Sequence, residues 1–91
     1  MTSLEMIPVL EKMFRFQWEE AQQCYVLLYP EGMVKLNGPA GEILSLVDGK
    51  RNLVQIIELL TEKYPQADNI SDDVLAFIDD AFQQNWIRGL V

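Results

Sequence analysis

A tight turn followed by a very short strand is expected in the stretch YPEGMVKLN of this 91-residue chain, and it limits the sheets that the chain can form. Proline presets φ at the first turn position and glycine tolerates a positive φ, so Pro30-Glu31-Gly32 predicts a tight turn. Only Met33 to Leu36 then remain for a strand, because Asn37 is suited to cap a helix. A strand that is followed by a helix, with no further strand to pair with it, predicts an open sheet edge.

Two further strands are expected upstream of this turn. Residues Met13 to Trp18 alternate strictly, with Phe14 and Phe16 on the same side as Trp18, which is the pattern of a half-buried strand. Residues Cys24 to Tyr29 are apolar on both faces, as expected of a central strand. The simplest sheet is therefore a three-stranded antiparallel meander with Met33 to Leu36 at its edge.

Three helices are expected after the strands. The first follows Asn37 and ends at Asp48-Gly49, the second begins with a capping box at Asn52 and Gln55, and the third is capped by Ser71. Each helix carries an apolar stripe, and the third one is unusually wide. The stripes comprise Ala40, Ile43, Leu44 and Val47; Leu53, Ile56, Ile57 and Leu60; and Val74, Leu75, Phe77, Ile78, Ala81 and Phe82.

The order of the elements predicts an α+β fold, a three-stranded antiparallel meander followed by three helices in a winged-helix-like arrangement. Residues 1–12 show no clear period and contain Pro8, so a flexible N-terminal arm is expected there. Residues 13–91 are expected to form a single domain, and the apolar tail that begins at Trp86 should fold back onto it.

The composition argues against catalysis. The chain has no histidine, which removes the commonest general base and the commonest zinc ligand. Cys24 lies within an expected strand and is interpreted as a small core residue. The pairs Asp72-Asp73 and Asp79-Asp80 fit a helix cap and a solvated face rather than a metal site. We expect no enzyme activity, no cofactor and no bound metal.

The cellular setting is expected to be the cytoplasm. The N-terminus lacks the basic and apolar segments of a signal peptide, and no apolar run is long enough to cross a membrane. A single cysteine cannot form a disulfide within the chain, which suits a reducing compartment.

Two functional alternatives follow from the expected architecture. A winged-helix DNA-binding regulator is one, but the net charge of −7 and the four aspartates of the third helix oppose contact with nucleic acid. Peptide binding by strand addition is the other, with the edge strand Met33 to Leu36 facing a groove. Surplus apolar residues of the third helix, namely Leu75, Ile78 and Phe82, are expected to form the other wall. Lys35 and the shortness of the strand could instead serve only to protect the edge, and strand exchange between copies would allow a homodimer.

The sequence resembles the pyrroloquinoline quinone biosynthesis protein D (PqqD) family over about Phe14 to Ile87. The resemblance rests on the block VLLYPEGMVKLN, on Ala40 to Leu44, on the D-G-x-R segment from Asp48 to Arg51, and on Asp73-Val74 with Trp86-Ile87 near the C-terminus.

The resemblance implies a peptide chaperone rather than an enzyme. The partners implied are the ribosomally made precursor peptide PqqA and the radical S-adenosylmethionine enzyme PqqE, to which the peptide is presented. The resemblance implies that the peptide pairs with the third strand and lies against the third helix. The residues it points to here are Met33, Val34, Lys35 and Leu36 of the strand and Leu75, Ile78, Asp79 and Phe82 of the helix.

Overall fold

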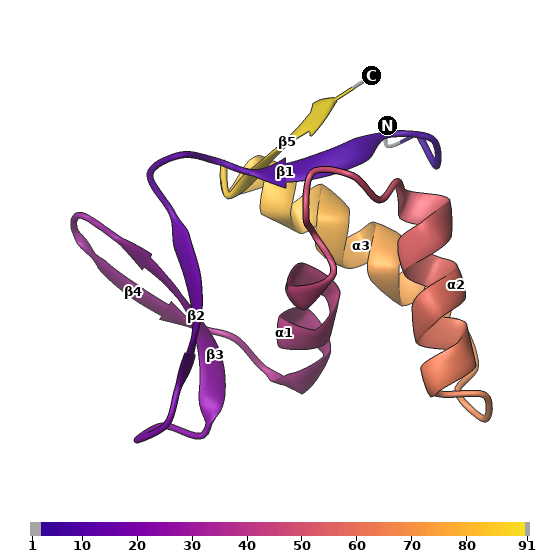
Figure 1. The fold of residues 1–91 in the computed structure, drawn as a ribbon, viewed down its shortest axis with the longest axis horizontal. Helices are drawn as coiled ribbons and strands as arrows, with labels where there is room; N and C mark the ends of the chain where they lie inside the picture. The colour runs from indigo at the N-terminus through magenta and orange to yellow at the C-terminus, as the bar shows by residue number, and fades with distance from the viewer. Residues whose placement is uncertain (1–2, 91) are drawn as a thin grey trace.

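A computed structural model describes residues 3–90, which form two small antiparallel sheets and three helices (Figure 1). The three-stranded sheet has the order β2-β3-β4, and the two-stranded sheet joins β1 to β5. This is the α+β class predicted from the sequence. The elements are β1 (Ile7–Leu10), β2 (Arg15–Glu19), β3 (Cys24–Tyr29), β4 (Gly32–Lys35), α1 (Gly38–Ser45), α2 (Leu53–Lys63), α3 (Ile70–Gln83) and β5 (Ile87–Leu90).

The meander β2-β3-β4 has the predicted order, with β3 in the centre. Its register places Leu27 of β3 between Phe16 of β2 and Val34 of β4. Side chains alternate along a strand, so these three residues share one face of the sheet, and that face packs on the helices. Leu27 is fully buried there. The sheet is therefore anchored to the core through its central strand.

A strand occupies part of the segment in which an N-terminal arm was expected. Ile7–Leu10 form β1, which pairs antiparallel with β5 from Ile7 opposite Leu90 to Leu10 opposite Ile87. The two ends of the described chain thus lie side by side in Figure 1. Pro8 is fully buried. Proline has no N–H to donate and is therefore found on edge strands, and in a two-stranded sheet both strands are edge strands. The expected folding back of the tail is seen in β5.

The helix starts agree with the sequence analysis in two of three cases. Asn37 caps α1, its Oδ1 accepting from the Ala40 N–H at 2.8 Å. Asn52 and Gln55 form the predicted reciprocal capping box of α2, each side chain accepting from the other's N–H at 2.9 Å. The expected cap at Ser71 is wrong. Helix α3 begins at Ile70 after Asn69, whose positive φ of 62° ends the preceding loop without a side-chain cap.

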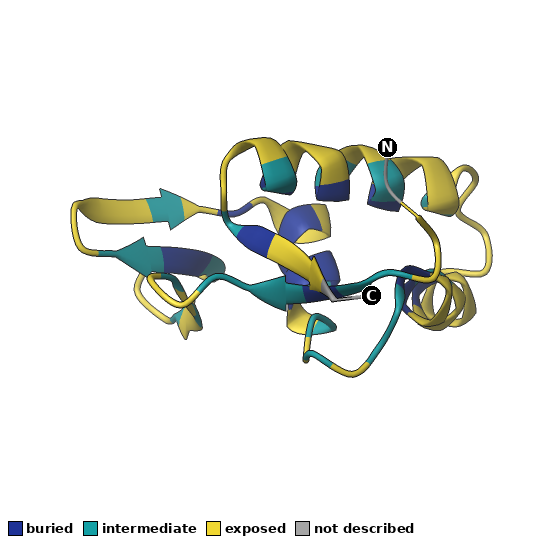
Figure 2. Cartoon of the chain, turned by 90° about the horizontal axis from the view of Figure 1, so that it is seen from above, coloured by how far each residue is buried: buried dark blue, intermediate teal, exposed yellow. Residues whose placement is uncertain are grey.

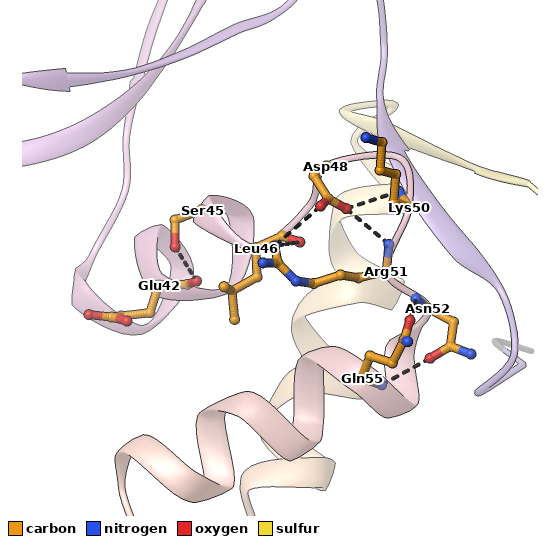
Figure 3. Close-up of polar contacts among 8 residues, drawn as sticks. All are labelled: Glu42, Ser45, Leu46, Asp48, Lys50, Arg51, Asn52 and Gln55. Atoms are coloured by element: carbon orange, nitrogen blue, oxygen red, sulfur yellow. Dashed lines mark hydrogen bonds and ion pairs between the residues drawn. The ribbon is translucent and has the colours of Figure 1, made fainter.

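Asp48 organises the connection between α1 and α2 (Figure 3). Its Oδ1 accepts from the N–H groups of Lys50 and Arg51, both at 2.9 Å. The Arg51 guanidinium lies 3.4 Å from Asp48 Oδ2 and donates to the Leu46 carbonyl at 3.2 Å. Helix α1 ends at Ser45, before the predicted Asp48-Gly49 stop, and Gly49 takes a positive φ of 78° in the turn that follows.

The core lies between the helices and the inner face of the meander. Helix α3 is buried along the side that faces the rest of the chain and exposed along the opposite side (Figure 2). Its unusually wide apolar arc is explained by the second sheet, because α3 packs against β5 as well as α2. Within residues 3–90, none of the three helices has the length and apolar character that a membrane span requires.

Candidate functional site

The outer edge of β4 is open within the described part of the chain. Strand β4 pairs with β3 on one side, and the N- and C-terminal strands pair with each other instead of covering its other side. The Leu36 N–H donates to the Tyr25 carbonyl at 3.0 Å, which fixes the phase of the ladder. Hydrogen-bonded pairs alternate in an antiparallel ladder, so the main-chain groups of Met33 and Lys35 point away from β3. These two residues offer N–H and C=O groups to an added strand.

The side chains of β4 divide between two faces. Val34 shares the helix-facing side with buried Leu36, whereas Met33 and Lys35 share the opposite face and are exposed. Met33 retains 40% of its surface. An added strand would alternate in the same way, so every second side chain would point to the side on which the helices lie.

A hollow of about 410 Å³ lies on that side, at the end of β4. Most of the lining residues from β4 and α1 are apolar, and α3 contributes two aspartates with a phenylalanine between them in the sequence. The lining residues are Lys35, Leu36, Asn37, Pro39, Ala40 and Ile43 from β4 and α1, Asp73, Phe77 and Asp80 from α3, and Trp86 after it.

The structure places two of the expected strand residues at the hollow, but none of the expected helix residues lines it. Lys35 and Leu36 line the hollow, and Met33 and Val34 lie on the same strand. On α3, Ile78 is fully buried in the core, and Leu75 and Phe82 are half-buried against it. Asp79 is exposed on α3 but does not line the hollow. The wall is formed instead by Asp73, Phe77 and Asp80.

Trp86, like Asp73, Phe77 and Asp80, lines the hollow although it was not among the expected site residues. Asn85, with a positive φ of 62°, turns the chain between α3 and β5. The Trp86 N–H donates to the Ala81 carbonyl at 3.0 Å, and its own carbonyl accepts from the Glu11 N–H at 2.8 Å. Its ring lies 6.4 Å from that of Phe77. The apolar sequence of the tail indicated that it packs on the domain. The sequence did not indicate that the N-terminal segment holds Trp86 in place.

A second hollow of about 410 Å³ adjoins the first and shares Pro39, Ile43 and Asp73 with it. Glu42 is one of its lining residues, and its carboxylate binds the Lys63 ammonium at 2.8 Å. The hydrogen bond from Lys63 lowers the pKa of Glu42, and the same bond raises the pKa of Lys63. The pair joins α1 to the end of α2 at the surface, where such contacts contribute little stability.

The chemistry of this region is that of binding. Open main-chain groups can hydrogen-bond an extended chain, and the hollow beside them can hold its side chains. Among residues 3–90, no cluster of histidine, cysteine, aspartate or glutamate is arranged to hold a metal ion. Cys24 is a free, half-buried cysteine on β3.

Comparison with known sequences gives consistent matches. The model of the family "Coenzyme PQQ synthesis protein D (PqqD)" matches residues 24–87. A "PqqA binding protein" of Pseudomonas aeruginosa strain UCBPP-PA14 is 55% identical over 86 residues, which cover 94% of each chain. Its namesake in Azotobacter vinelandii is 54% identical over 87 residues, 96% of this chain and 95% of the relative.

A solved structure also matches. It is the solution NMR structure of the PqqD truncation of Methylobacterium extorquens PqqCD, described as a functional and stand-alone recognition element for ribosomally synthesised and post-translationally modified peptides. The TM-score is 0.74 and the identity 29%, with 89% of this chain and 87% of the other covered. With a family match over most of its length and relatives more than half identical to it, the chain belongs to the coenzyme PQQ synthesis protein D (PqqD) family.

Proposed function

We propose that this protein binds the precursor peptide PqqA by adding it as a strand to the open edge of β4. The observation that carries the proposal is the outward direction of the Met33 and Lys35 main-chain groups beside the hollow. Main-chain pairing supplies affinity in such complexes, and pockets for alternate side chains supply specificity. The names of the relatives support PqqA as the peptide, and the likeness to a peptide-recognition element supports the mode of binding.

Its role in pyrroloquinoline quinone biosynthesis is then that of a binding module rather than a catalyst. The bound peptide is presented to the radical S-adenosylmethionine enzyme PqqE, as the family resemblance implies. A peptide held as an edge strand is fixed over only a few residues. The rest of the peptide would remain free to enter the active site of an enzyme docked elsewhere on the surface.

Proline substitution at Lys35 tests the pairing. Lys35→Pro removes an N–H that points outward and places the proline ring at the edge where the peptide would pair, so it should abolish PqqA binding while leaving the β3-β4 ladder intact. Lys35→Ala is the matched control, because it removes the same side chain but keeps the N–H. Isothermal titration calorimetry with PqqA measures both variants, and circular dichroism checks that each remains folded.

The pair of variants separates the main chain from the side chain. Loss of binding in Lys35→Pro together with near-normal binding in Lys35→Ala is the expected result. Wild-type affinity in a folded Lys35→Pro variant would refute strand addition at this edge.

A further inference from the structure

We propose that the peptide segment lying against α3 carries basic side chains on both sides of an apolar one, at alternate positions, and that Asp73 and Asp80 select for them. This inference rests on the proposed function and specifies the chemistry of the peptide that the groove accepts. It follows from the composition of the helical wall, where Asp73, Phe77 and Asp80 face the hollow.

The spacing of the wall suits an extended chain. Asp73 and Asp80 are seven residues apart on α3, which corresponds to about 10 Å along the helix axis. Same-face side chains of a strand recur every 6–7 Å or so, and three successive ones span about 13 Å. Long lysine or arginine side chains can close the difference of a few ångströms at the two ends. The middle side chain then meets Phe77 and Trp86, which calls for an apolar residue.

No ion pair within residues 3–90 involves the two aspartates of this wall. The ion pairs there join Arg51 to Asp48, Lys63 to Glu42 and Arg88 to Glu11, and neither Asp73 nor Asp80 takes part. Lys35 also lines the hollow, but its place in β4 directs its side chain to the opposite face of the sheet. With a net charge of −7, the protein further attracts a basic segment during encounter.

Neutralising the wall tests the inference. Asp73→Asn and Asp80→Asn should each weaken PqqA binding by about two- to fivefold, as expected for surface ion pairs, and the double variant by about tenfold. The affinity of the double variant should also depend less on salt than that of the wild type. Titration calorimetry at low and high salt measures both effects.

Asp72→Asn is the matched control for Asp73→Asn. Both residues lie in the first turn of α3 and interact similarly with the helix dipole, but Asp72 does not line the hollow. It should therefore bind PqqA like the wild type. Equal loss in Asp72→Asn and Asp73→Asn would assign the effect to the helix dipole or to net charge and overturn the inference.

Charge reversal identifies the partner positions on the peptide. Asp80→Lys should weaken binding, and one PqqA variant with a lysine or arginine changed to glutamate should restore it. Failure of every such peptide to restore binding would overturn the inference. The proposed function fails separately, since it requires only that Lys35→Pro abolishes binding; wild-type affinity in the aspartate variants would leave strand addition standing.

Discussion

Gly41 is the residue at which one added carbon should disturb the fold most directly. It lies buried in α1, facing the ring of Tyr25 on β3. A Cβ at this position would lie 2.8 Å from Tyr25 Cδ2 and 3.3 Å from Tyr25 Cβ. The Tyr25 ring cannot easily retreat, because it stacks on Phe16 with ring centroids 4.6 Å apart. The close approach of α1 to the sheet therefore depends on glycine.

We expect Gly41→Ala to lower the free energy of unfolding by about 1–3 kcal/mol, as overpacking does. Alanine forms helices better than glycine by about 1 kcal/mol, so helix propensity alone predicts the opposite sign. Urea unfolding of the two proteins decides between these effects.

The same change in a Tyr25→Ala background is the control. With the ring absent, Gly41→Ala should be neutral or stabilising. If Gly41→Ala raises the free energy of unfolding of the otherwise wild-type protein, the packing of α1 does not depend on this close contact.

At the scale of elements, the Asp48 turn that links α1 to α2 predicts sensitivity to acid. Its hydrogen bonds, first from the Arg51 N–H and then from the Lys50 N–H, hold the pKa of Asp48 below its ordinary value of 3.8. A carboxyl group whose pKa is lowered in the native state stabilises the fold at pH values above its ordinary pKa. That contribution is lost as the pH falls through the native pKa. Asp48→Asn keeps an oxygen acceptor but has no charge to protonate.

The variant should therefore be less stable than the wild type at neutral pH and should lose less stability on acidification. Urea unfolding is followed from neutral pH to well below 3.8, so that the series passes through the lowered native pKa of Asp48, where the wild-type contribution is lost. Asp68→Asn, at an exposed position in the loop before α3, is the control. Parallel pH profiles for wild type and Asp48→Asn would contradict the role of the turn.

Local sequence signals located most of these elements. The bounds of β3 agree with the apolar run from Cys24 to Tyr29, and the capping box placed the start of α2. These signals succeed because they depend on neighbouring residues. The start of α3 was misplaced because Ser71 and Asn69 are both plausible caps, and only the backbone shows that Asn69 adopts the positive φ that ends the loop.

The helical wall of the site could not be predicted in the same way. The wide arc of α3 was interpreted as surplus apolar surface for a partner. In the structure, Ile78 is in the core, and Phe82 lies close to Gly89 of β5. The sequence of β1 has no clear alternation and contains Pro8, so the second sheet was not predicted. The apolar residues of α3 that pack on this sheet were therefore interpreted as having no partner within the fold. The open edge of β4 was predictable from the order of the central strands and helices, although it also depends on β1 and β5 pairing with each other.

At the scale of the whole molecule, the sheet of β1 and β5 meets the candidate site at Trp86, the residue that directly precedes β5. The Glu11 N–H donates to the carbonyl of Trp86 at 2.8 Å, and Trp86 lines the hollow beside β4. Glu11 itself does not line the hollow. The N-terminal segment is therefore expected to support peptide binding without touching the peptide.

Glu11→Pro tests this connection, because proline lacks the N–H that fixes the Trp86 carbonyl. One lost hydrogen bond costs about 1 kcal/mol, so PqqA affinity should fall by about two- to tenfold if Trp86 is released. The emission of Trp86 should also change, and a Trp18→Phe background leaves it as the one remaining tryptophan of the chain.

Glu11→Ala is the control, since it removes the 3.4 Å ion pair with Arg88 but keeps the N–H. If both variants bind PqqA equally well, the sheet of the chain ends stabilises the fold without positioning the site. Weaker binding in Glu11→Pro alone would show that the two sheets act together, one pairing with the peptide and the other holding the aromatic wall against it.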